Sequence, residues 1–388
     1  MIRQAKRMDG IASAIFSQID ALRREQIEMG KDVITLSIGS PDLPPAPHVT
    51  EAICAAAADR GNYGYTFTQG TDAFRQAIAG WYKQKYGVAL DSAKEVHALI
   101  GSQEGLSHIS LCLVDPGDVV LVPDPGYPIY TAGPLMAGAE LYAMPLLPEN
   151  GYLPDLAAIP EEILRRAKLM ILNYPNNPLA ATAPRAFFDE VVRYAKRYAF
   201  AVCHDFAYSE QAFDGYVPDS FLTAEDALDV AVEFHSTSKS YNMAGCRVGF
   251  MAGNAEIIGL LSRLKSNFDY GIFQPLQAGA IAAITGDQTP VQEMAEAYRR
   301  RRDVMVDGLN ALGWKLEKPR ATMYLWIPTP DGRPSFEFAV DLLKNAGVAV
   351  IPGVAFGAHG EGYFRIALVQ PEKRLAEAVE RIGKWLGK

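Results

Sequence analysis

The feature that most constrains the fold of this chain is a repeated alternation of short apolar runs with stretches of helical pattern. The apolar runs predict strands at residues 95–101, 119–123, 167–175, 200–205, 229–236 and 247–253. Most of their connections have helical periodicity, as in residues 183–198. Because strands that alternate with helices form parallel sheets covered by helices, we predict an α/β fold with a largely parallel sheet.

The pattern changes near residues 282–290, where a long charged helical segment begins and an α+β tail follows. A chain of 388 residues is long enough for two domains with separate cores. We predict a large domain at residues 46–284 and a small domain formed by residues 1–45 and 285–388. The first residues are too few to fold alone, so this N-terminal arm is expected to pack with the tail.

Composition argues against several classes of protein. The apolar runs are far shorter than the roughly 20 residues of a membrane span, and the N-terminus lacks the apolar core of a signal peptide, so a cytoplasmic protein is expected. The net charge of −8, without a long basic run, argues against nucleic-acid binding. Four scattered cysteines without a CxxC pair favour neither a metal site nor a disulfide framework.

Four predicted strands end in polar residues that can take part in catalysis. The segments at these ends are "IGSQEG", "NYPNNP", "HDFAY" and "HSTSK". One polar residue at a strand end is usually a turn or capping residue. Ligands of open α/β sheets, however, bind beyond the carboxyl ends of the strands. Four such endings on one edge therefore predict a binding site there.

Five of these residues fit a carbonyl group and a phosphate. Lys239 follows a buried strand, and burial near other cations lowers the pKa of an amine, which favours the neutral form that makes Schiff bases. Ser102 and Gln103 begin a predicted helix, whose N-terminus suits a phosphate. Ser236 and Arg247 add a hydroxyl group and a positive charge.

The other residues suit an aromatic ring. Asp205 can hold a protonated ring nitrogen, Tyr208 or Asn177 can donate to a ring oxygen, and Tyr127 offers a flat face for stacking. Together with the lysine and the phosphate site, they describe a phosphorylated pyridine aldehyde, pyridoxal 5′-phosphate (PLP).

The segments "NYPNNP", "HDFAY" and "STSKSYNMAGCRVGF", in this order, resemble the class I and II aminotransferases of PLP fold type I. The resemblance runs from "ITLSIGSPDLPPAP" to "YFRIAL", nearly the whole chain. It implies a mostly parallel seven-stranded sheet between helices, a smaller α+β domain and a homodimer. It also implies a ping-pong transfer of the amino group from an L-amino acid to a 2-oxo acid.

The resemblance also implies roles for individual residues. Lys239 forms the Schiff base and moves the proton, Asp205 pairs with the ring nitrogen, and Tyr208 is the third catalytic residue. The implied cofactor-binding set is Ser102, Gln103, Tyr127, Asn177, Asp205, Tyr208, Ser236, Lys239, Arg247 and Tyr65. Tyr65, favoured over Tyr63 by its spacing to Gly70, is expected to reach the site of a second subunit. The implied substrate-binding set is Gly39, Asn177 and Arg365, whose guanidinium binds the α-carboxylate in a two-pronged contact that lysine cannot copy.

The substrate pair is less constrained by the sequence. "SYNMAG", "AYSEQAFDGY", "PDPGYPIY" and "GSQEG" most resemble the branch with LL-diaminopimelate and alanine (glutamate–pyruvate) aminotransferases. The sequence departs from that branch at Gln103, where lysine is common, and near Ala14, where a tyrosine is replaced. LL-diaminopimelate with 2-oxoglutarate or glutamate is the expected pair, within amino-acid biosynthesis. Alanine, aspartate and methionine aminotransferases remain alternatives, and Phe16, Asn267 and Tyr270 are expected to line the side-chain pocket.

Other classes of function were weighed against this one. Lys239 and Arg365 also suit a PLP-dependent C–S lyase, which would release ammonia and pyruvate without an oxo acid. A PLP-containing regulator needs a DNA-binding domain, for which few residues precede "VITLSIG", and a mere binding protein gives the Schiff-base lysine no role. Glu104 is expected to face outward, where an acid suits the start of a helix, and residues 299–302, "RRRR", to form a solvated face.

Overall fold

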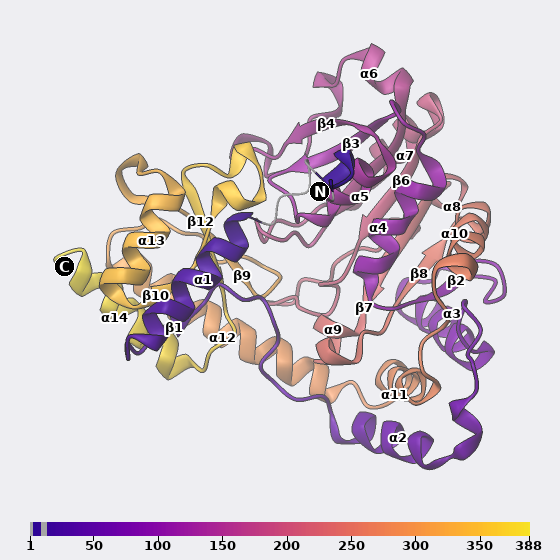
Figure 1. Ribbon diagram of the computed structural model, residues 1–388, viewed down its shortest axis with the longest axis horizontal. Helices are drawn as coiled ribbons and strands as arrows, with labels where there is room; N and C mark the ends of the chain where they lie inside the picture. Colours follow the sequence, from indigo (N-terminus) through magenta and orange to yellow (C-terminus); the bar gives the residue numbers. More distant parts are fainter. Residues whose placement is uncertain (1–2, 9–13) are drawn as a thin grey trace.

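In the computed structural model, which describes residues 3–8 and 14–388, a seven-stranded sheet lies between helices in one lobe of the molecule (Figure 1). The strand order is β2 (Val96–Leu99), β8 (Gly249–Gly253), β7 (Ala231–Ser236), β6 (Ala201–Asp205), β5 (Ala167–Asn173), β3 (Val119–Asp124) and β4 (Glu140–Pro145). Strand β8 is antiparallel to both neighbours, and the other pairs are parallel. The predicted fold class is therefore confirmed, although β4, a half-exposed edge strand, was not predicted.

Side chains alternate between the two faces of this sheet. Val119 and Leu121 join one hydrophobic cluster, and Val120 and Val122 join another. The helices of this lobe are α2 (Pro47–Ala58), α3 (Asp72–Tyr86), α4 (Ser102–Leu113), α5 (Ile129–Ala137), α6 (Glu161–Arg166), α7 (Arg185–Tyr198), α8 (Ala227–Val230), α9 (Thr237–Ser240), α10 (Ala255–Phe268) and α11 (Gln274–Thr285). Helices on both faces explain why the parallel strands are apolar throughout.

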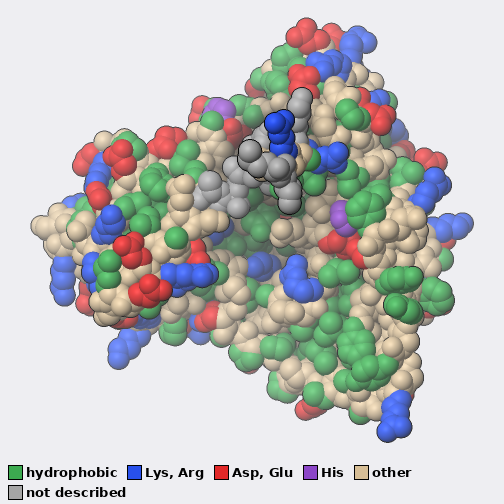
Figure 2. All heavy atoms as spheres, in the orientation of Figure 1, with side chains coloured by type: hydrophobic (Ala, Val, Ile, Leu, Met, Phe, Trp, Pro, Cys, Tyr) green, Lys and Arg blue, Asp and Glu red, His purple; other side chains and the backbone are tan. Residues whose placement is uncertain are grey.

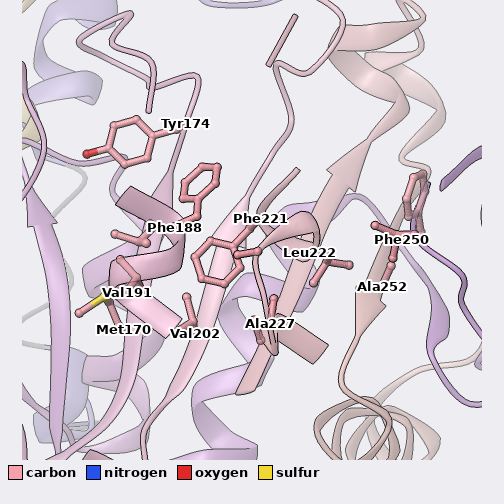
Figure 3. Close-up of a cluster of buried hydrophobic side chains, with 14 of the residues drawn as sticks. Met170, Tyr174, Phe188, Val191, Val202, Phe221, Leu222, Ala227, Phe250 and Ala252 are labelled. Atoms are coloured by element: carbon pink, nitrogen blue, oxygen red, sulfur yellow. The ribbon is translucent and has the colours of Figure 1, made fainter. Parts of the chain in front are cut away.

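Helix α7 illustrates how the sequence builds these layers. It begins directly after Pro184, and its buried residues Phe188 and Val191 recur at helical spacing. These two side chains pack against Met170 and Val202 of the sheet in the cluster that Figure 3 draws. Burial of this apolar face holds the neighbouring strands β5 and β6 in place, and the site lies at their carboxyl ends.

The second lobe combines both ends of the chain. It contains α1 (Ala14–Glu28), α12 (Thr289–Ala311), α13 (Ser335–Ala346), α14 (Glu372–Trp385), the sheet β11 (Ile351–Pro352)–β12 (Tyr363–Ala367)–β9 (Tyr324–Pro328) and the pair β1 (Ile34–Thr35)–β10 (Val348–Ala349). Ile19 and Leu36 share one buried cluster with residues of the tail, so the N-terminal segment packs there as expected. The exact domain boundaries stay a prediction, and residues 1–2 and 9–13 lie outside the described residues.

The prediction of a solvated face at residues 299–302 holds for Arg300, which is exposed, but is wrong for Arg301 and Arg302. Arg301 and Arg302 are only 4% and 2% exposed. Arg301 donates two hydrogen bonds to Asp42, of 2.7 and 2.8 Å, and Arg302 donates one of 2.5 Å to Asp214. Helix α12 thus ties the segment before α2 and the loop after β6 to the small lobe, because buried guanidinium groups need carboxylate partners.

The cysteines and the helices add two observations. Cys54, Cys112, Cys203 and Cys246 are all free, and Cys54 is exposed. Among the helices of residues 3–8 and 14–388, none has the length and apolar character required to cross a membrane.

Candidate active site

A cavity of about 640 Å³ lies at the carboxyl edge of the large sheet. Figure 2 shows the corresponding hollow between the two lobes, with Lys and Arg side chains gathered in it. Eleven predicted site residues line the cavity: Gly39, Ser102, Gln103, Tyr127, Asn177, Asp205, Tyr208, Ser236, Lys239, Arg247 and Arg365. The twelfth, Tyr65, lies outside it and is 89% exposed.

Lys239 enters the cavity from the short helix α9, which directly follows strand β7. Its Nζ donates a 2.5 Å hydrogen bond to the backbone oxygen of Gly39, and no carboxylate within the described part of the chain pairs with it. Burial, followed by the positive charges of Arg365 and Arg247, lowers the pKa of this amine. The lysine is therefore poised to act as a neutral nucleophile and base.

Asp205 stands at the end of strand β6 and is 6% exposed. Its Oδ2 accepts a 2.7 Å hydrogen bond from Tyr130 Oη, and its Oδ1 accepts one of 3.2 Å from the Ala207 backbone N–H. Burial raises its pKa, and no ion pair involves it among the residues that the structure describes. A buried carboxylate without a cation partner fits a ligand that brings a positive charge, such as a protonated ring nitrogen.

The start of helix α4 forms an anion cup with Ser236, Ser238 and Arg247. Gly101 precedes α4 with φ +74°, and a Cβ there would lie 2.3 Å from Arg247 Nη2, so only glycine lets the guanidinium approach this closely. Arg247 Nη1 is held by the backbone oxygen of Ala244 at 3.1 Å. Backbone N–H groups, hydroxyl groups and one guanidinium are the donors that suit a phosphate.

Between the cup and Arg365 lies space edged by aromatic and amide groups. Asn177 Nδ2 donates to Tyr208 Oη at 3.3 Å, and Tyr208 Oη lies 3.1 Å from Tyr324 Oη. Tyr127 Oη donates to Gln103 Oε1 at 3.4 Å. Aromatic faces beside amide and hydroxyl groups suit a planar ring with a polar edge, so the residues present as a whole fit PLP.

Arg365 is 3% exposed and reaches the cavity from strand β12 of the small lobe. It donates to Asn177 Oδ1 at 2.8 Å and to the Ser37 backbone oxygen at 2.9 Å. Its guanidinium lies 4.4 Å from the ring centre of Tyr324 and 4.8 Å from that of Phe356. Its Nε has no partner within the described residues, so donor capacity remains for a carboxylate.

Sequence reasoning missed several residues of the site. Tyr130, which holds Asp205, and Tyr324, which flanks Tyr208 and Arg365, were not predicted. Tyr130 stands three residues after Tyr127, and this helical spacing could have indicated that both face the cavity. Tyr324 lies on a strand far along the chain, and no local signal connects it to the site.

The side-chain pocket differs from expectation. Phe16 lines the cavity, as expected, but Tyr270 and Asn267 do not line it. Tyr270 instead packs against Tyr65 with tilted rings, whose centres are 4.8 Å apart.

Glu104 does not face solvent, contrary to the prediction. Its side chain is 13% exposed and forms an ion pair with Lys265, which is 1% exposed. Its Oε2 also accepts a 2.7 Å hydrogen bond from the Ile100 backbone N–H. The buried ammonium of α10 needs this carboxylate, and the pair fixes the first turn of α4 beside the anion cup.

A buried network lies directly beneath the strand ends and was also missed. Glu233 accepts hydrogen bonds from Tyr82 Oη at 2.8 Å and from the Phe221 backbone N–H at 2.7 Å. Its two oxygens also contact His204 Nδ1 at 2.9 Å and His235 Nε2 at 3.2 Å. Burial opposes ionisation, yet the two histidines lower the pKa of Glu233 to about 2. His204 is thus a hydrogen-bonded strand residue next to Asp205.

A seven-stranded α/β sheet with this lysine, aspartate and anion cup at its carboxyl edge defines a PLP-dependent enzyme of fold type I. The chain belongs to the class I and II aminotransferases, because the model of that family matches residues 31–382. It is 51% identical over 387 residues to an LL-diaminopimelate aminotransferase of Moorella thermoacetica, covering 100% of this chain and 99% of the relative. A relative of the same name from Desulforudis audaxviator is also 51% identical, covering 99% and 98%.

Solved structures agree with this assignment. Substrate-bound BacF from Bacillus subtilis is 40% identical with a TM-score of 0.95, covering 99% of this chain and 98% of BacF. A probable N-succinyldiaminopimelate aminotransferase from Thermus thermophilus is 39% identical with a TM-score of 0.92, covering 96% and 100%. The chain is therefore an aminotransferase that uses PLP, acting on an amino acid and a 2-oxo acid.

Proposed function

We propose that the chain transfers the amino group of LL-diaminopimelate to 2-oxoglutarate, forming glutamate. The observation that carries the proposal is the 51% identity, across the full length of the chain, to relatives named for that reaction. The alternatives are alanine, aspartate and methionine as donors, and they become outcomes of the experiment below. In this proposal the reaction belongs to amino-acid biosynthesis.

The proposed roles follow from the contacts of each residue. PLP, when bound, supplies an aldehyde that condenses with amines and a ring that withdraws electrons. The anion cup holds its phosphate, Asp205 pairs with its ring nitrogen, and Asn177 and Tyr208 bind its ring oxygen. Tyr127 stacks on the ring and orients it.

Lys239 moves the proton. Its pKa is lowered by burial, so the neutral amine is available to remove the α-proton of the donor and would then return a proton to C4′, the aldehyde carbon of PLP. Arg365 fixes the α-carboxylate, which keeps the α-proton within reach of the lysine. A Cβ at Gly39 would lie 2.2 Å from Tyr324 Oη, so only glycine fits beside this tyrosine. The backbone oxygen of Gly39 accepts the hydrogen bond from Lys239 Nζ.

The proposed function is tested by mixing the purified, PLP-loaded protein with single amino acids and no oxo acid. Loss of the absorbance of the bound aldehyde form measures each half-reaction, and LL-diaminopimelate is expected to have the highest kcat/KM. A higher kcat/KM for alanine, aspartate or methionine would overturn LL-diaminopimelate as the proposed amino donor. Release of ammonia and pyruvate from cysteine or cystathionine would identify a C–S lyase instead.

We also propose a homodimer in which Tyr65 completes the anion cup of its partner. Its support is an exposed aromatic patch of Tyr63, Tyr65, Phe67, Tyr270 and Phe273, each at least 40% exposed. Within this patch the rings of Tyr63 and Phe273 pack edge to face, with their centres 5.3 Å apart. Large exposed aromatic patches typically mark protein interfaces. Sedimentation of a monomer with full activity would contradict the proposal, as would a Tyr65→Phe variant with unchanged PLP affinity.

A cytoplasmic location completes the proposal. The free thiols, with Cys54 exposed, fit a reducing compartment. Fractionation of the source cells, with detection of the native protein, tests this location.

A further inference from the structure

The wall of the cavity contributed by helix α1 carries charge that the proposed reaction does not use. Asp20, Arg23 and Arg24 line the same cavity as Lys239 and Arg365. They recur with Phe16 at spacings of three, four and seven residues, which places them on one face of the helix. Helix α1 crosses the small lobe at the side of the hollow (Figures 1 and 2).

The three charged side chains form a connected cluster. Arg23 donates to Asp20 Oδ1 from Nε at 3.0 Å and from Nη2 at 2.7 Å, and Arg24 Nη2 lies 2.7 Å from Asp20 Oδ2. The Arg23 side chain is 17% exposed, whereas that of Arg24 is 69% exposed. Hydrogen bonding from Arg23 lowers the pKa of Asp20, which keeps the carboxylate ionised. Two arginines and one aspartate leave one net positive charge.

The remaining charges of the cavity wall already have partners in the proposed reaction. In that reaction Asp205 pairs with the ring nitrogen and Arg247 binds the phosphate. Arg365 binds the α-carboxylate, and Lys239 moves the proton. Among the described residues that line the cavity, the charged side chains without a role in the proposed reaction are therefore those of the cluster on α1. Arg23 Nη1 also has no hydrogen-bond partner within the part of the chain that the structure describes.

A chain of aromatic contacts links helix α1 to Arg365. Phe16 packs edge to face against Phe356, with ring centres 5.3 Å apart. The guanidinium of Arg365 lies over the ring of Phe356. The rise of a helix places Arg23 about 10 Å along the α1 axis from Phe16. A substrate held by Arg365 can therefore meet Arg23 only through the end of its side chain.

We propose that Asp20, Arg23 and Arg24 form the subsite for the side-chain end of a dicarboxylic amino acid. Arg23 binds the distal carboxylate, with Arg24 at the rim, and Asp20 accepts a hydrogen bond from a distal ammonium group where the substrate has one. Glutamate and 2-oxoglutarate offer the carboxylate alone, and LL-diaminopimelate offers both groups. The inference rests on the proposed function and names the substrate class of that same site.

A structural role is the competing explanation, because arginine and aspartate three or four residues apart stabilise many helices without any ligand. The chain contains a control in the Arg165–Glu161 pair of helix α6, which has the same 2.7 Å contact at a spacing of four residues instead of three and does not line the cavity. Arg165→Gln removes such a pair at a distance from the site. Arg23→Gln removes one at the cavity wall.

The experiment uses the PLP-loaded protein and measures kcat/KM of the half-reaction for glutamate, L-norleucine, L-2-aminopimelate and LL-diaminopimelate. Loss of a hydrogen-bonded charge in Arg23→Gln is expected to lower kcat/KM for glutamate about 10-fold to 100-fold relative to norleucine. Arg23→Lys is expected to recover part of that loss, since it restores the charge without the planar fork. Asp20→Asn is expected to reduce the preference for LL-diaminopimelate over 2-aminopimelate, which has the same length but no distal amine.

Each result decides between the two roles. An Arg23→Gln variant that loses glutamate and norleucine activity in equal proportion, or resembles Arg165→Gln, would overturn the subsite. A protein that accepts neither glutamate nor LL-diaminopimelate would overturn it as well. If LL-diaminopimelate is a poor donor while Arg23→Gln loses glutamate selectively, the proposed function fails and the subsite stands.

Discussion

The floor and the roof of the cavity are built differently. The floor consists of the carboxyl ends of β6 and β7, where Asp205 is 6% exposed and the network around Glu233 is fully buried. The roof is the cavity wall formed by helix α1, where the side chains of Arg23, Asp20 and Arg24 are 17%, 33% and 69% exposed. Buried and hydrogen-bonded groups are held rigidly, whereas exposed side chains adapt to what they bind. The comparison suggests that the floor sets the chemistry common to all donors and the roof selects among them.

The largest expected effect is on the floor. Lys239→Ala removes both the nucleophile and the base, so kcat should fall about ten-thousand-fold for every donor. PLP should still bind, because the anion cup and Asp205 remain, and an added small amine should recover part of the rate. Single-turnover kinetics test this, with exposed Lys94→Ala as the control. If kcat of the variant fell much more for one donor amino acid than for another, the division of roles between floor and roof would be contradicted.

The next effect is on stability rather than rate. Glu233→Gln places an amide among the donors Tyr82 Oη and Phe221 N–H, and the free energy of unfolding should fall by about 3 kcal/mol. Urea unfolding measures it, with exposed Glu51→Gln as the matched control.

The ionisation of Glu233 should also make the free energy of unfolding depend on pH. The pKa of Glu233 is about 2 when folded and 4.5 ordinarily, so its stabilisation is present above about pH 4.5 and is lost as the pH falls toward 2. This part of the acid dependence should disappear in Glu233→Gln. An unchanged acid profile would show that the network does not depend on the charge of the carboxylate.

A smaller effect concerns Asp205. Burial raises its pKa, and the hydrogen bond from Tyr130 opposes that rise. Tyr130→Phe should therefore raise the pKa further and move the acid limb of kcat/KM to higher pH for all donors, because Asp205 must be ionised to hold the ring nitrogen. Buried Tyr174, bonded to the Tyr152 backbone oxygen at 2.7 Å, gives the control variant Tyr174→Phe. A limb that stays in place would show that Asp205 does not control it.

The same contrast explains what the sequence could predict. Residues of the floor follow apolar strands directly, so Lys239 and Asp205 are marked by their position at a strand end. The fold class follows from the alternation of strands and helices. Edge strand β4 was missed because its half-exposed side chains give no clear period.

The roof and the lobe contacts could not be predicted in this way. Asp20 and Arg23 belong to a helix whose charges are indistinguishable in sequence from a solvated face. Arg301 and Arg302 are buried only because α12 meets segments more than 80 positions away in the chain, including Asp214. Such contacts depend on the packing of the two lobes, which has no local signature.

The smallest expected effect separates packing from charge in the roof. Phe16→Leu keeps an apolar contact with Phe356 but loses the edge-to-face geometry of the rings, which is worth about 1 kcal/mol. Because Phe356 supports Arg365, the change should raise KM about 5-fold for every donor that has an α-carboxylate. The ratio of glutamate to norleucine activity should therefore stay constant in Phe16→Leu while it falls in Arg23→Gln. A change of that ratio in Phe16→Leu would mean that α1 discriminates among donors by its position rather than by its charges.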